Sequence, residues 1–314
     1  MSATKGNAFL GRHCVDALDF SPEEYDALLD LARAIHHNPA AYAQVCRGRL
    51  LATLFFEPST RTRLSFEAAM LRLGGQVITV ADPQTSSAAK GESLADTIRT
   101  VAGYADIIVM RHPKEGAAKL AALYSPVPII NGGDGAREHP TQTLTDLFTI
   151  REYKSRLDNL AVAFCGDLRY GRTVHSLIKA LACRKHNRFI LISPEELRLP
   201  DPVKEEVKQL GDAEIEETER MEGVLGQVDV LYMTRVQKER FFNEEDYIRL
   251  RDFYVLTKDR LREMNEDAIV MHPLPRVSEI AYEVDQDRRA VYFQQARLGV
   301  LARMALIASI LGVA

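Results

Sequence analysis

The chain has 314 residues, which is enough for two domains of ordinary size, each with a substantial core. Its hydrophobic fraction of 46% and charged fraction of 27% are those of a soluble globular protein. The net charge of −4 gives no global argument for binding nucleic acid or an anionic membrane, so any positive potential must be local to a cleft.

The hydropathy and the cysteines of the chain indicate the cellular compartment in which we expect the protein. No apolar run approaches 18 residues free of charge, so we expect no membrane span and no membrane partner. The chain shows no signal peptide, and its cysteines have neither CxxC nor Cys/His metal spacing. We therefore predict reduced thiols in a cytoplasmic protein, with no metal site and no cofactor. The cysteines are Cys14, Cys46, Cys165 and Cys183.

Short apolar runs alternate with helical patterns along the whole chain, as in repeated strand–helix units. Such a repeat predicts parallel sheets covered by helices on both faces. We expect two open sheets of four strands each, and hence two α/β domains. The predicted strands are residues 50–56, 76–80, 105–110, 127–131, 160–165, 189–193, 228–233 and 268–271.

A long helical pattern separates the two sets of strands and predicts the domain boundaries. Residues 141–153 are expected to form a rigid connecting helix. The first domain would then be residues 1–140 and the second residues 154–291. The helix predicted within residues 292–314 follows the last strand, and we expect it to pack back on the first domain.

The segment Ser59-Thr60-Arg61-Thr62-Arg63 is the most informative motif, because it joins a buried strand to a helix. Ser59 stands at the N-cap, where free N–H groups and the positive end of the helix dipole favour an anion. Arginine adds a planar fork that matches phosphate. The i, i+4 spacing of Arg63 and Glu67 indicates an ion pair within the helix, so Arg61 is the better phosphate ligand.

Arginines follow four of the predicted strands, at the edge where open α/β sheets bind ligands. A single such arginine is usually an ordinary surface residue, whereas arginines at equivalent positions after four strands indicate a site for several negative charges. The arginines are Arg111, then Arg169 and Arg172, then Arg235, and last Arg276.

Two further segments lie near these strand ends. His139 and Gln142 open the connecting helix and face the same way, and beside Gln142 and the phosphate motif His139 is a candidate hydrogen-bond donor to a carbonyl group. Residues 84–91 are mostly small and are expected to form a loop. This pattern fits two interpretations equally well. One is an ordinary flexible loop, and the other is a mobile lid that delivers Lys90 to an anion.

Residues 166–173 have the pattern G-x-x-x-x-G-R-T after a strand, which differs from a Walker A loop at one position. Arg172 replaces the essential lysine, and Asp167 would place a negative charge beside the phosphates. Nucleotide hydrolysis is therefore disfavoured.

Taken together, these motifs resemble the carbamoyltransferases, and in particular the catalytic chains that act on aspartate. The resemblance extends in order over essentially the whole chain. It rests on residues 55–63, on His139-Pro140-Thr141-Gln142, on residues 166–177, on residues 232–240 and on His272-Pro273-Leu274-Pro275-Arg276. Relatives that act on ornithine typically carry His-Cys-Leu-Pro at the last motif and lack the arginine of Thr234-Arg235-Val236-Gln237.

The resemblance implies a role for each matching residue. Carbamoyl phosphate would be bound by Ser59, Thr60, Arg61, Thr62, Ser86, Lys90, Arg111, His139 and Gln142. Within that set, Arg61, Thr62, Arg111 and His139 would be catalytic, and Gln142 would bind the carbamoyl amide. Aspartate would be bound by Lys90, Arg172, Arg235, Gln237, Leu274 and Pro275. Glu57 would pair with arginines of the second domain when the domains close.

The resemblance also implies transfer of a carbamoyl group to the α-amine of L-aspartate, the second step of de novo pyrimidine biosynthesis. Ser86 and Lys90 would enter from a neighbouring subunit, so the catalytic unit would be a homotrimer with shared active sites. Residues 166–173 resemble the same segment of enzymes that often have regulatory chains. The sequence leaves undecided whether such chains join the trimers into a larger assembly. The alternatives are the same chemistry on another amine, such as ornithine, and a scaffold without catalysis.

Overall fold

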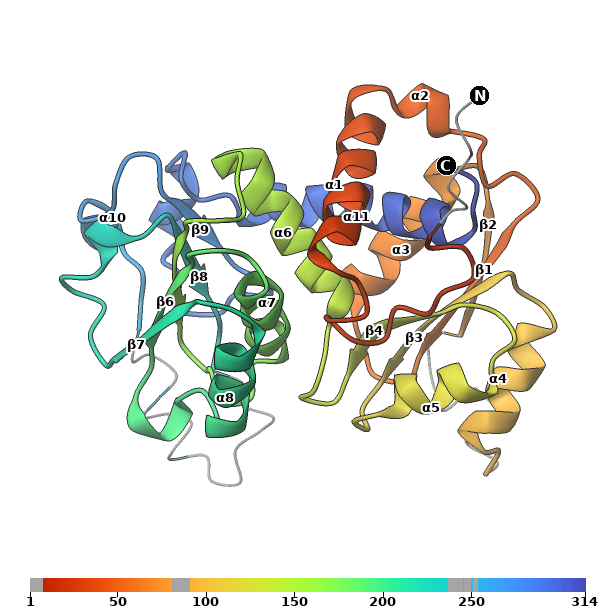
Figure 1. Ribbon diagram of the computed structural model, residues 1–314, viewed down its shortest axis with the longest axis horizontal. Coiled ribbons are helices and arrows are strands. Elements are labelled where there is room, and N and C mark those ends of the chain that lie inside the picture. The colour runs from red at the N-terminus through yellow and green to blue at the C-terminus, as the bar shows by residue number, and fades with distance from the viewer. Residues whose placement is uncertain (1–7, 81–90, 237–244, 246–249, 251–253) are drawn as a thin grey trace. The chain divides into compact units, whose positions relative to one another are not determined.

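The computed structural model describes residues 8–80, 91–236, 245, 250 and 254–314. They form two compact units, which consist of Met1–Phe148 with Leu298–Ala314 and of Thr149–Arg297. Each unit contains one parallel sheet with helices packed against it (Figure 1). The prediction of two open, parallel α/β domains is thereby confirmed.

The sheet of the first unit has four strands in the order β2-β1-β3-β4. They are β1 (Leu50–Phe55), β2 (Gln76–Val80), β3 (Ile107–His112) and β4 (Ile129–Asp134). The chain moves outward from β1 to β2, then crosses back to β3 on the other side of β1. The switch point therefore lies between β1 and β3, where Phe55 pairs with Arg111, and open α/β sheets bind their ligands at this place.

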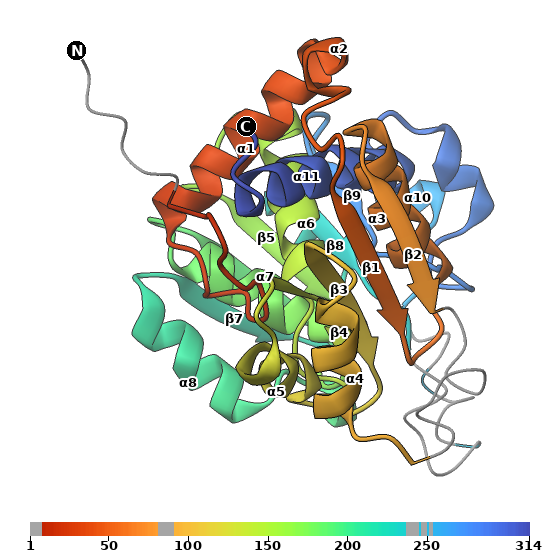
Figure 2. The same ribbon diagram turned by 90° about the vertical axis from the view of Figure 1, so that its right-hand side faces the viewer.

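Helices cover both faces of this sheet. Figures 1 and 2 show α4 and α5 on one face, and α1, α3 and α11 on the other. Ser21 and Glu24 form a capping box at the start of α1, and the Ser93 side chain caps α4. The helices are α1 (Pro22–His37), α2 (Pro39–Tyr42), α3 (Thr60–Arg72), α4 (Leu94–Ala102), α5 (Ala117–Tyr124), α6 (Pro140–Lys154) and α11 (Tyr292–Ile310).

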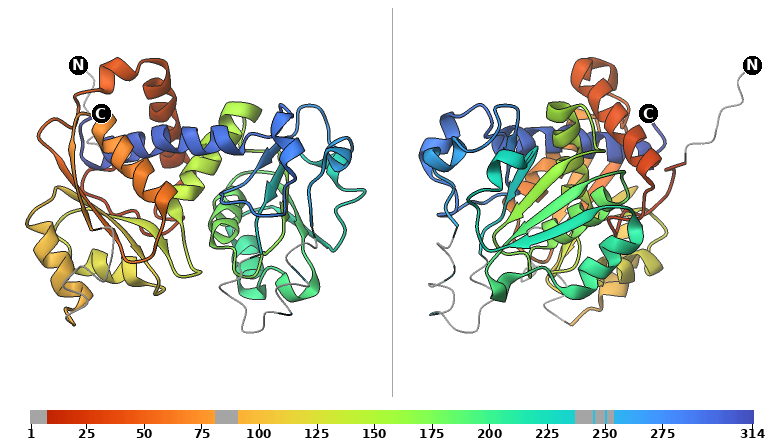
Figure 3. Two further views of the ribbon diagram at one scale, coloured as in Figure 1. Left: turned by 180° about the vertical axis from the view of Figure 1, so that it is seen from behind. Right: turned by 60° about the vertical axis from the view of Figure 1, so that its left-hand side comes forward.

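The sheet of the second unit has five strands in the order β7-β6-β5-β8-β9, and its switch point lies between β5 and β8 (Figure 3). The sequence predicted only four strands here, which was wrong. The fifth is β7, whose three glutamates hide it from a search for apolar runs; edge strands often carry such charges. The strands are β5 (Ala161–Cys165), β6 (Arg188–Ile192), β7 (Glu214–Thr218), β8 (Val230–Met233) and β9 (Ile269–Met271).

The helices of the second unit are shorter, apart from α7 and α8. They are α7 (Arg172–Ala182), η3 (Glu195–Leu197), α8 (Asp201–Leu210), η4 (Leu225–Gln227), α10 (Lys258–Leu261) and η6 (Tyr282–Gln286). Side chains of β5, β6, β8 and β9 form one buried apolar cluster with those of the loops around them. This core fixes the strand ends from which the site residues project.

The last helix returns to the first unit, as the sequence predicted. Its residues from Leu298 onward belong to that unit, although the preceding residues from Thr149 belong to the other. The buried Arg303 guanidinium anchors it, because Nη1 donates to Ser65 Oγ (3.0 Å) and lies 3.4 Å from Thr145 Oγ1. The two units divide within α6, between Phe148 and Thr149, inside the segment expected to connect the domains.

Two properties expected from composition can be compared with the structure. The four cysteines are free thiols, and three of them are buried. In the part of the chain that is described, no helix is both long and apolar enough to cross a membrane.

Candidate active site

The Ser-Thr-Arg-Thr-Arg motif lies where β1 gives way to α3. Ser59 has an extended backbone (φ −158°, ψ 95°) and is the N-cap residue, as predicted. Its side chain makes no capping bond, and only its carbonyl oxygen accepts from Arg63 N (3.2 Å). The first N–H groups of a helix have no acceptor within the helix. This end of α3 therefore presents amide donors and a serine hydroxyl to an incoming anion.

The two arginines of the motif have different surroundings. Arg63 Nε lies 3.7 Å from Glu67 Oε1, and Glu67 also accepts from Thr79 Oγ1 (2.9 Å), which confirms the predicted ion pair. Arg61 lies two residues earlier, in the same first turn of α3, and is exposed. Thr62 is buried, with 7% of its surface exposed. The motif thus separates a structural arginine from one that is accessible to a ligand.

Arg111 joins this end of α3 to the ends of β3 and β4. Its guanidinium donates to Gly132 O (3.2 Å) and to Glu57 Oε1 (2.9 Å). A Cβ atom on Gly132 would lie 3.5 Å from the Thr62 methyl group, so Thr62 and Arg111 both flank Gly132. Glu57, which the resemblance pairs with arginines of the second domain, here binds Arg111 within its own unit.

His139 and Gln142 open α6, directly after the turn that follows β4. His139 is buried, and its carbonyl oxygen accepts from Gln142 N (2.9 Å) and Thr143 N (3.2 Å). The Gln142 side chain donates from Nε2 to Asp146 Oδ1 at 2.7 Å. Both residues belong to the same unit as the phosphate motif.

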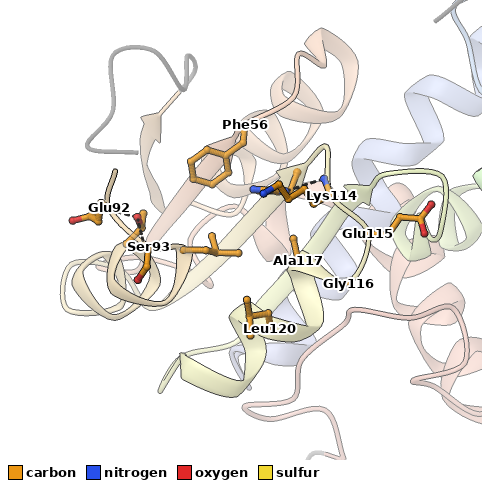
Figure 4. Close-up of a pocket in the computed structure, with 11 residues that line it drawn as sticks. Phe56, Glu92, Ser93, Lys114, Glu115, Gly116, Ala117 and Leu120 are labelled. Atoms are coloured by element: carbon orange, nitrogen blue, oxygen red, sulfur yellow. Dashed lines mark hydrogen bonds between the residues drawn. The ribbon is translucent and has the colours of Figure 1, made fainter. Parts of the chain in front are cut away.

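A pocket of about 500 Å³ adjoins these strand ends on the side of α4 and α5 (Figure 4). Phe56 and His112 line it, and the centroids of their rings lie 5.4 Å apart. Ser93 and Gly116, the N-cap residues of α4 and α5, also line it. None of the described residues that line this pocket belongs to the predicted phosphate set.

In the second unit the ends of β5 and β8 meet at Gly166. This glycine has a φ of +122°, and a Cβ atom there would lie 2.2 Å from Thr234 O. A side chain at this position would therefore push the two segments apart. The contact brings the loop that leads to Arg172 beside the segment that carries Arg235. Both arginines are half-buried.

The loop that resembles a Walker A sequence has a different construction. The buried Asp167 accepts from Tyr170 N (2.9 Å), so a carboxylate of the chain already binds one of the loop amides. His175, which lies on α7, closes the loop, since its Nε2 lies 2.8 Å from Leu168 O. This architecture supports the interpretation that the loop positions Arg172, the first residue of α7.

His272 shapes the loop that follows β9. Its Nδ1 accepts from Leu274 N (2.7 Å), and its Nε2 lies 2.7 Å from Glu279 Oε1. Leu274 has a φ of +57°, and the peptide bond to Pro275 is cis. The imidazole thus fixes the backbone at Leu274 and Pro275, whose carbonyl groups are predicted ligands. Sequence reasoning missed this role of His272 and Glu279, since no local motif links residues seven apart in a loop.

The electrostatics of this loop favour a neutral imidazole. Burial lowers the pKa of His272, and the Arg235 and Arg276 charges lower it further, against the opposing effect of Glu279. Burial raises the pKa of Glu279, but hydrogen bonds from His272 and from backbone amides act against it, and the net pKa is lowered. Because Nδ1 accepts a hydrogen bond, Nε2 carries the proton of the neutral imidazole and donates a hydrogen bond to Glu279.

One of the strand-end arginines has a structural role instead of the predicted ligand role. Arg276 binds the carboxylate of Asp285 and donates to Tyr292 Oη (3.0 Å). Its guanidinium also lies over the Tyr282 ring, 4.8 Å from the centroid. These contacts tie the loop to η6 and α11, so Arg276 is corrected to a packing residue.

Three predicted site residues cannot be placed, because Ser86, Lys90 and Gln237 lie outside the described residues. The described ones form two groups, one in each unit, which follow the carboxyl ends of the strands. The first unit carries Ser59, Thr60, Arg61, Thr62, Arg111, His139 and Gln142, and the second carries Arg172, Arg235, Leu274 and Pro275.

Known proteins share both the sequence and the fold. A family model described as aspartate/ornithine carbamoyltransferase, carbamoyl-P binding domain, matches residues 12–152, and the corresponding Asp/Orn binding domain matches residues 158–310. An aspartate carbamoyltransferase catalytic subunit of Clostridium botulinum (strain Okra) is 58% identical over 96% of this chain and 99% of its own length.

Two solved structures give the same result. Aspartate transcarbamoylase from Trypanosoma cruzi in complex with N-(phosphonacetyl)-L-aspartic acid has a TM-score of 0.91 at 40% identity, and covers 97% of each chain. The catalytic subunit from M. jannaschii has a TM-score of 0.88 at 47% identity, and covers 96% of this chain and 98% of that one.

This chain therefore belongs to the aspartate/ornithine carbamoyltransferase family, whose models match almost its whole length. Within that family, the relatives and structures reported above all carry the name of the enzyme that acts on aspartate. The predicted resemblance to the carbamoyltransferases is thereby confirmed.

The buried His272 leads to a prediction about pH. Because its folded-state pKa lies below 6.5, the unfolded chain takes up the proton first as the pH falls. Stability should therefore decrease as the pH drops from about 6.5, by up to about 1.4 kcal/mol per pH unit for one group. Calorimetric unfolding midpoints between pH 8 and 5 should show a smaller decrease for His272→Gln than for the unaltered chain. The exposed control His36→Gln should retain the full decrease; equal slopes in all three proteins would contradict the assignment.

Proposed function

We propose that this enzyme transfers the carbamoyl group of carbamoyl phosphate to the α-amine of L-aspartate, which gives N-carbamoyl-L-aspartate and phosphate. This is the second step of de novo pyrimidine biosynthesis. The observation that supports the choice of acceptor is that two half-buried arginines, Arg172 and Arg235, follow the neighbouring strands β5 and β8, whose ends approach closely at Gly166 and Thr234. Two guanidinium groups suit an acceptor with two carboxylates.

The first unit would bind carbamoyl phosphate. Its phosphate would be held by the amide groups at the start of α3, by the hydroxyls of Ser59, Thr60 and Thr62, and by Arg61 and Arg111. The Glu57 carboxylate already orients Arg111 through a bond of 2.9 Å, so the guanidinium is held in place before the substrate arrives. Trypanosoma cruzi aspartate transcarbamoylase, 40% identical to this chain, has been solved in complex with carbamoyl phosphate.

The carbonyl group of the substrate would be polarised by Thr62, Arg111 and His139. Attack by the amine forms a tetrahedral intermediate in which negative charge collects on this oxygen. Donors fixed in advance at such a position typically contribute about 2.7–4 kcal/mol each to the barrier reduction. Gln142 would bind the carbamoyl amide beside them.

The second unit would bind aspartate. Arg172, Arg235 and Gln237 would hold the two carboxylates, and the carbonyl groups of Leu274 and Pro275 would orient the amine. The neutral His272 supports this arrangement, because it fixes Leu274 N at 2.7 Å from Nδ1. Placing the two substrates face to face supplies a further part of the rate.

The proton inventory follows from the same arrangement. The neutral α-amine attacks the carbamoyl carbon, the bond to the phosphate oxygen breaks, and the leaving phosphate accepts the amine proton. His139 acts as a hydrogen-bond donor, and this attack requires no covalent enzyme nucleophile. No cofactor is needed to balance the reaction.

The proposed assembly is a cytoplasmic homotrimer in which Ser86 and Lys90 of one subunit complete the site of its neighbour. Both residues lie outside the described part of the chain, and the proposal rests on the family resemblance of the loop. The relatives from Clostridium botulinum are named catalytic subunits. That name fits an assembly with separate regulatory chains, which we keep as an extension of the trimer.

We expect Arg61→Ala to reduce kcat/KM by roughly 10²–10³-fold, because it removes a charged donor from the phosphate. Its folding should be unchanged, since Arg61 is exposed. The matched control is Arg63→Ala, which removes an arginine from the same helix turn but only a structural ion pair. Near-normal turnover by the Arg61 variant, measured as phosphate release, would overturn the phosphate assignment.

Acceptor choice is tested by phosphate release from carbamoyl phosphate with L-aspartate and, separately, with L-ornithine. We expect turnover with aspartate alone, because ornithine would bring a cationic side chain to Arg172 and Arg235. Arg235→Ala should raise KM for aspartate and leave the affinity for carbamoyl phosphate within about twofold, since one charge-assisted bond to the acceptor is lost.

The control for this variant is Arg188→Ala. It removes an arginine from the start of β6, at the amino ends of the strands, whereas Arg235 follows the carboxyl end of β8. It should leave both substrates unaffected. Equal weakening of aspartate and carbamoyl phosphate by Arg235→Ala would argue against separate binding units, and turnover with ornithine alone would replace the proposed acceptor.

Shared active sites are tested by subunit exchange between two inactive variants, Lys90→Ala and Arg61→Ala. In a mixed trimer about one site in three combines an intact Arg61 with an intact Lys90 of its neighbour. We expect activity to return after mild dissociation and reassociation of the mixture. Each variant treated alone should remain inactive, and a mixture without regained activity would count against the trimer.

A further inference from the structure

Asp146 lies one turn beyond Gln142 on α6 and fixes the direction of its amide. Gln142 Nε2 donates to Asp146 Oδ1 at 2.7 Å, and Asp146 is fully buried. An ionised carboxylate has only acceptors, so it must meet the NH₂ end of the amide. The amide oxygen of Gln142 is therefore turned away from Asp146.

A buried arginine supports the charge on Asp146. Arg303 on α11 is 4% exposed; Nη1 donates to Ser65 Oγ (3.0 Å) and to Gly299 O (3.1 Å). Its guanidinium also lies over the Phe66 ring, 5.1 Å from the centroid. Burial lowers the pKa of Arg303 to about 10 and Asp146 opposes this effect, so the guanidinium stays charged at neutral pH. A fixed positive charge here favours an ionised Asp146.

Close packing holds this arginine in one position. A Cβ atom on Gly299 would lie 2.7 Å from Arg303 Nη1 and 3.0 Å from Thr145 Oγ1. The absence of a side chain at residue 299 therefore leaves room for the guanidinium between α11 and α6. The whole second unit lies between Gln142 and Arg303 in the sequence, yet the fold brings both residues close to Asp146.

We propose that Asp146 is a positioning residue that makes the Gln142 side chain a hydrogen-bond acceptor toward the substrate and thereby selects a carbamoyl over an acyl phosphate. This inference rests on the proposed function, in which Gln142 binds the carbamoyl amide. The carbamoyl NH₂ donates to the Gln142 oxygen. An acetyl group has a methyl at the same place and cannot donate, so it gains nothing from the oriented amide.

The test compares the binding of carbamoyl phosphate and acetyl phosphate by calorimetric titration without any acceptor. In Asp146→Asn the new amide can donate to the Gln142 oxygen, so the Gln142 amide is no longer held in one direction. We expect the affinity for carbamoyl phosphate to fall about tenfold, the value of one hydrogen bond, while that for acetyl phosphate changes little. An unchanged ratio of the two affinities would overturn the inference.

A double variant separates positioning from a structural effect. If Asp146 acts through Gln142, Asp146→Asn should cause no further loss of selectivity in a Gln142→Leu background. A purely structural role would weaken both ligands equally, and would do so in either background. The control Thr143→Val removes a buried hydroxyl from the same helix turn and should leave the ratio unchanged.

Asp146→Asn also leaves a buried guanidinium without its facing charge, which can prevent folding. Asp146→Asn combined with Arg303→Met removes both charges and keeps an aliphatic chain over Phe66. It should fold and show the same loss of selectivity; a folded double variant with full selectivity would contradict the proposal.

The outcome is independent of the acceptor. If the unaltered protein binds carbamoyl phosphate in preference to acetyl phosphate but transfers nothing to aspartate, the proposed function fails and the role of Asp146 is still measurable. If transfer to aspartate proceeds and Asp146→Asn keeps full selectivity, the proposed function holds and the positioning role fails.

Discussion

The pairing of Arg111 with Glu57 across the switch point of the first sheet is the interaction on which the proposed chemistry depends. Phe55 and Arg111 are partners in the β1–β3 ladder, so the strand register itself places the guanidinium beside the turn that leads into α3. Glu57 then fixes it at 2.9 Å. Parallel strands all end at one edge, and the helix that follows each strand begins there. Positive charge gathers at that edge although the whole chain has a net charge of −4.

Sequence patterns predicted most of the fold and of the site because both are built from local segments. Apolar runs revealed the strands that are buried on both faces, and the spacing of Arg63 and Glu67 revealed their ion pair. The pattern failed at β7, which has the same partial burial as β2 but lacks the apolar residues that revealed β2. Strand β7 has glutamates at three of its five positions, so its place in the sheet depends on pairing with β6, which no local rule indicates.

The roles of residues whose partners lie elsewhere in the chain could not be predicted from the sequence either. Arg276 follows a strand, as Arg235 does, and only the fold shows that Asp285 and Tyr292 bind it. His272 likewise belongs to a motif that the sequence revealed. Its role in fixing the loop, however, depends on its contacts with Glu279 and with the backbone of Leu274. In each case the sequence indicated which residue types gather at a strand end, and the tertiary partners decided which of them remain available to a ligand.

Buried polar groups of this chain serve to orient other groups, and this explains why their cost in stability is tolerated. A buried carboxylate or guanidinium is expensive unless it is paired. Here Asp167 fixes a turn that positions Arg172, Glu279 fixes His272, and Asp146 fixes Gln142. Each pair leaves a neighbouring donor or acceptor with a defined direction before any ligand arrives. An enzyme that stabilises charge with fixed dipoles needs this arrangement, because donors that must reorient during the reaction lose much of their effect.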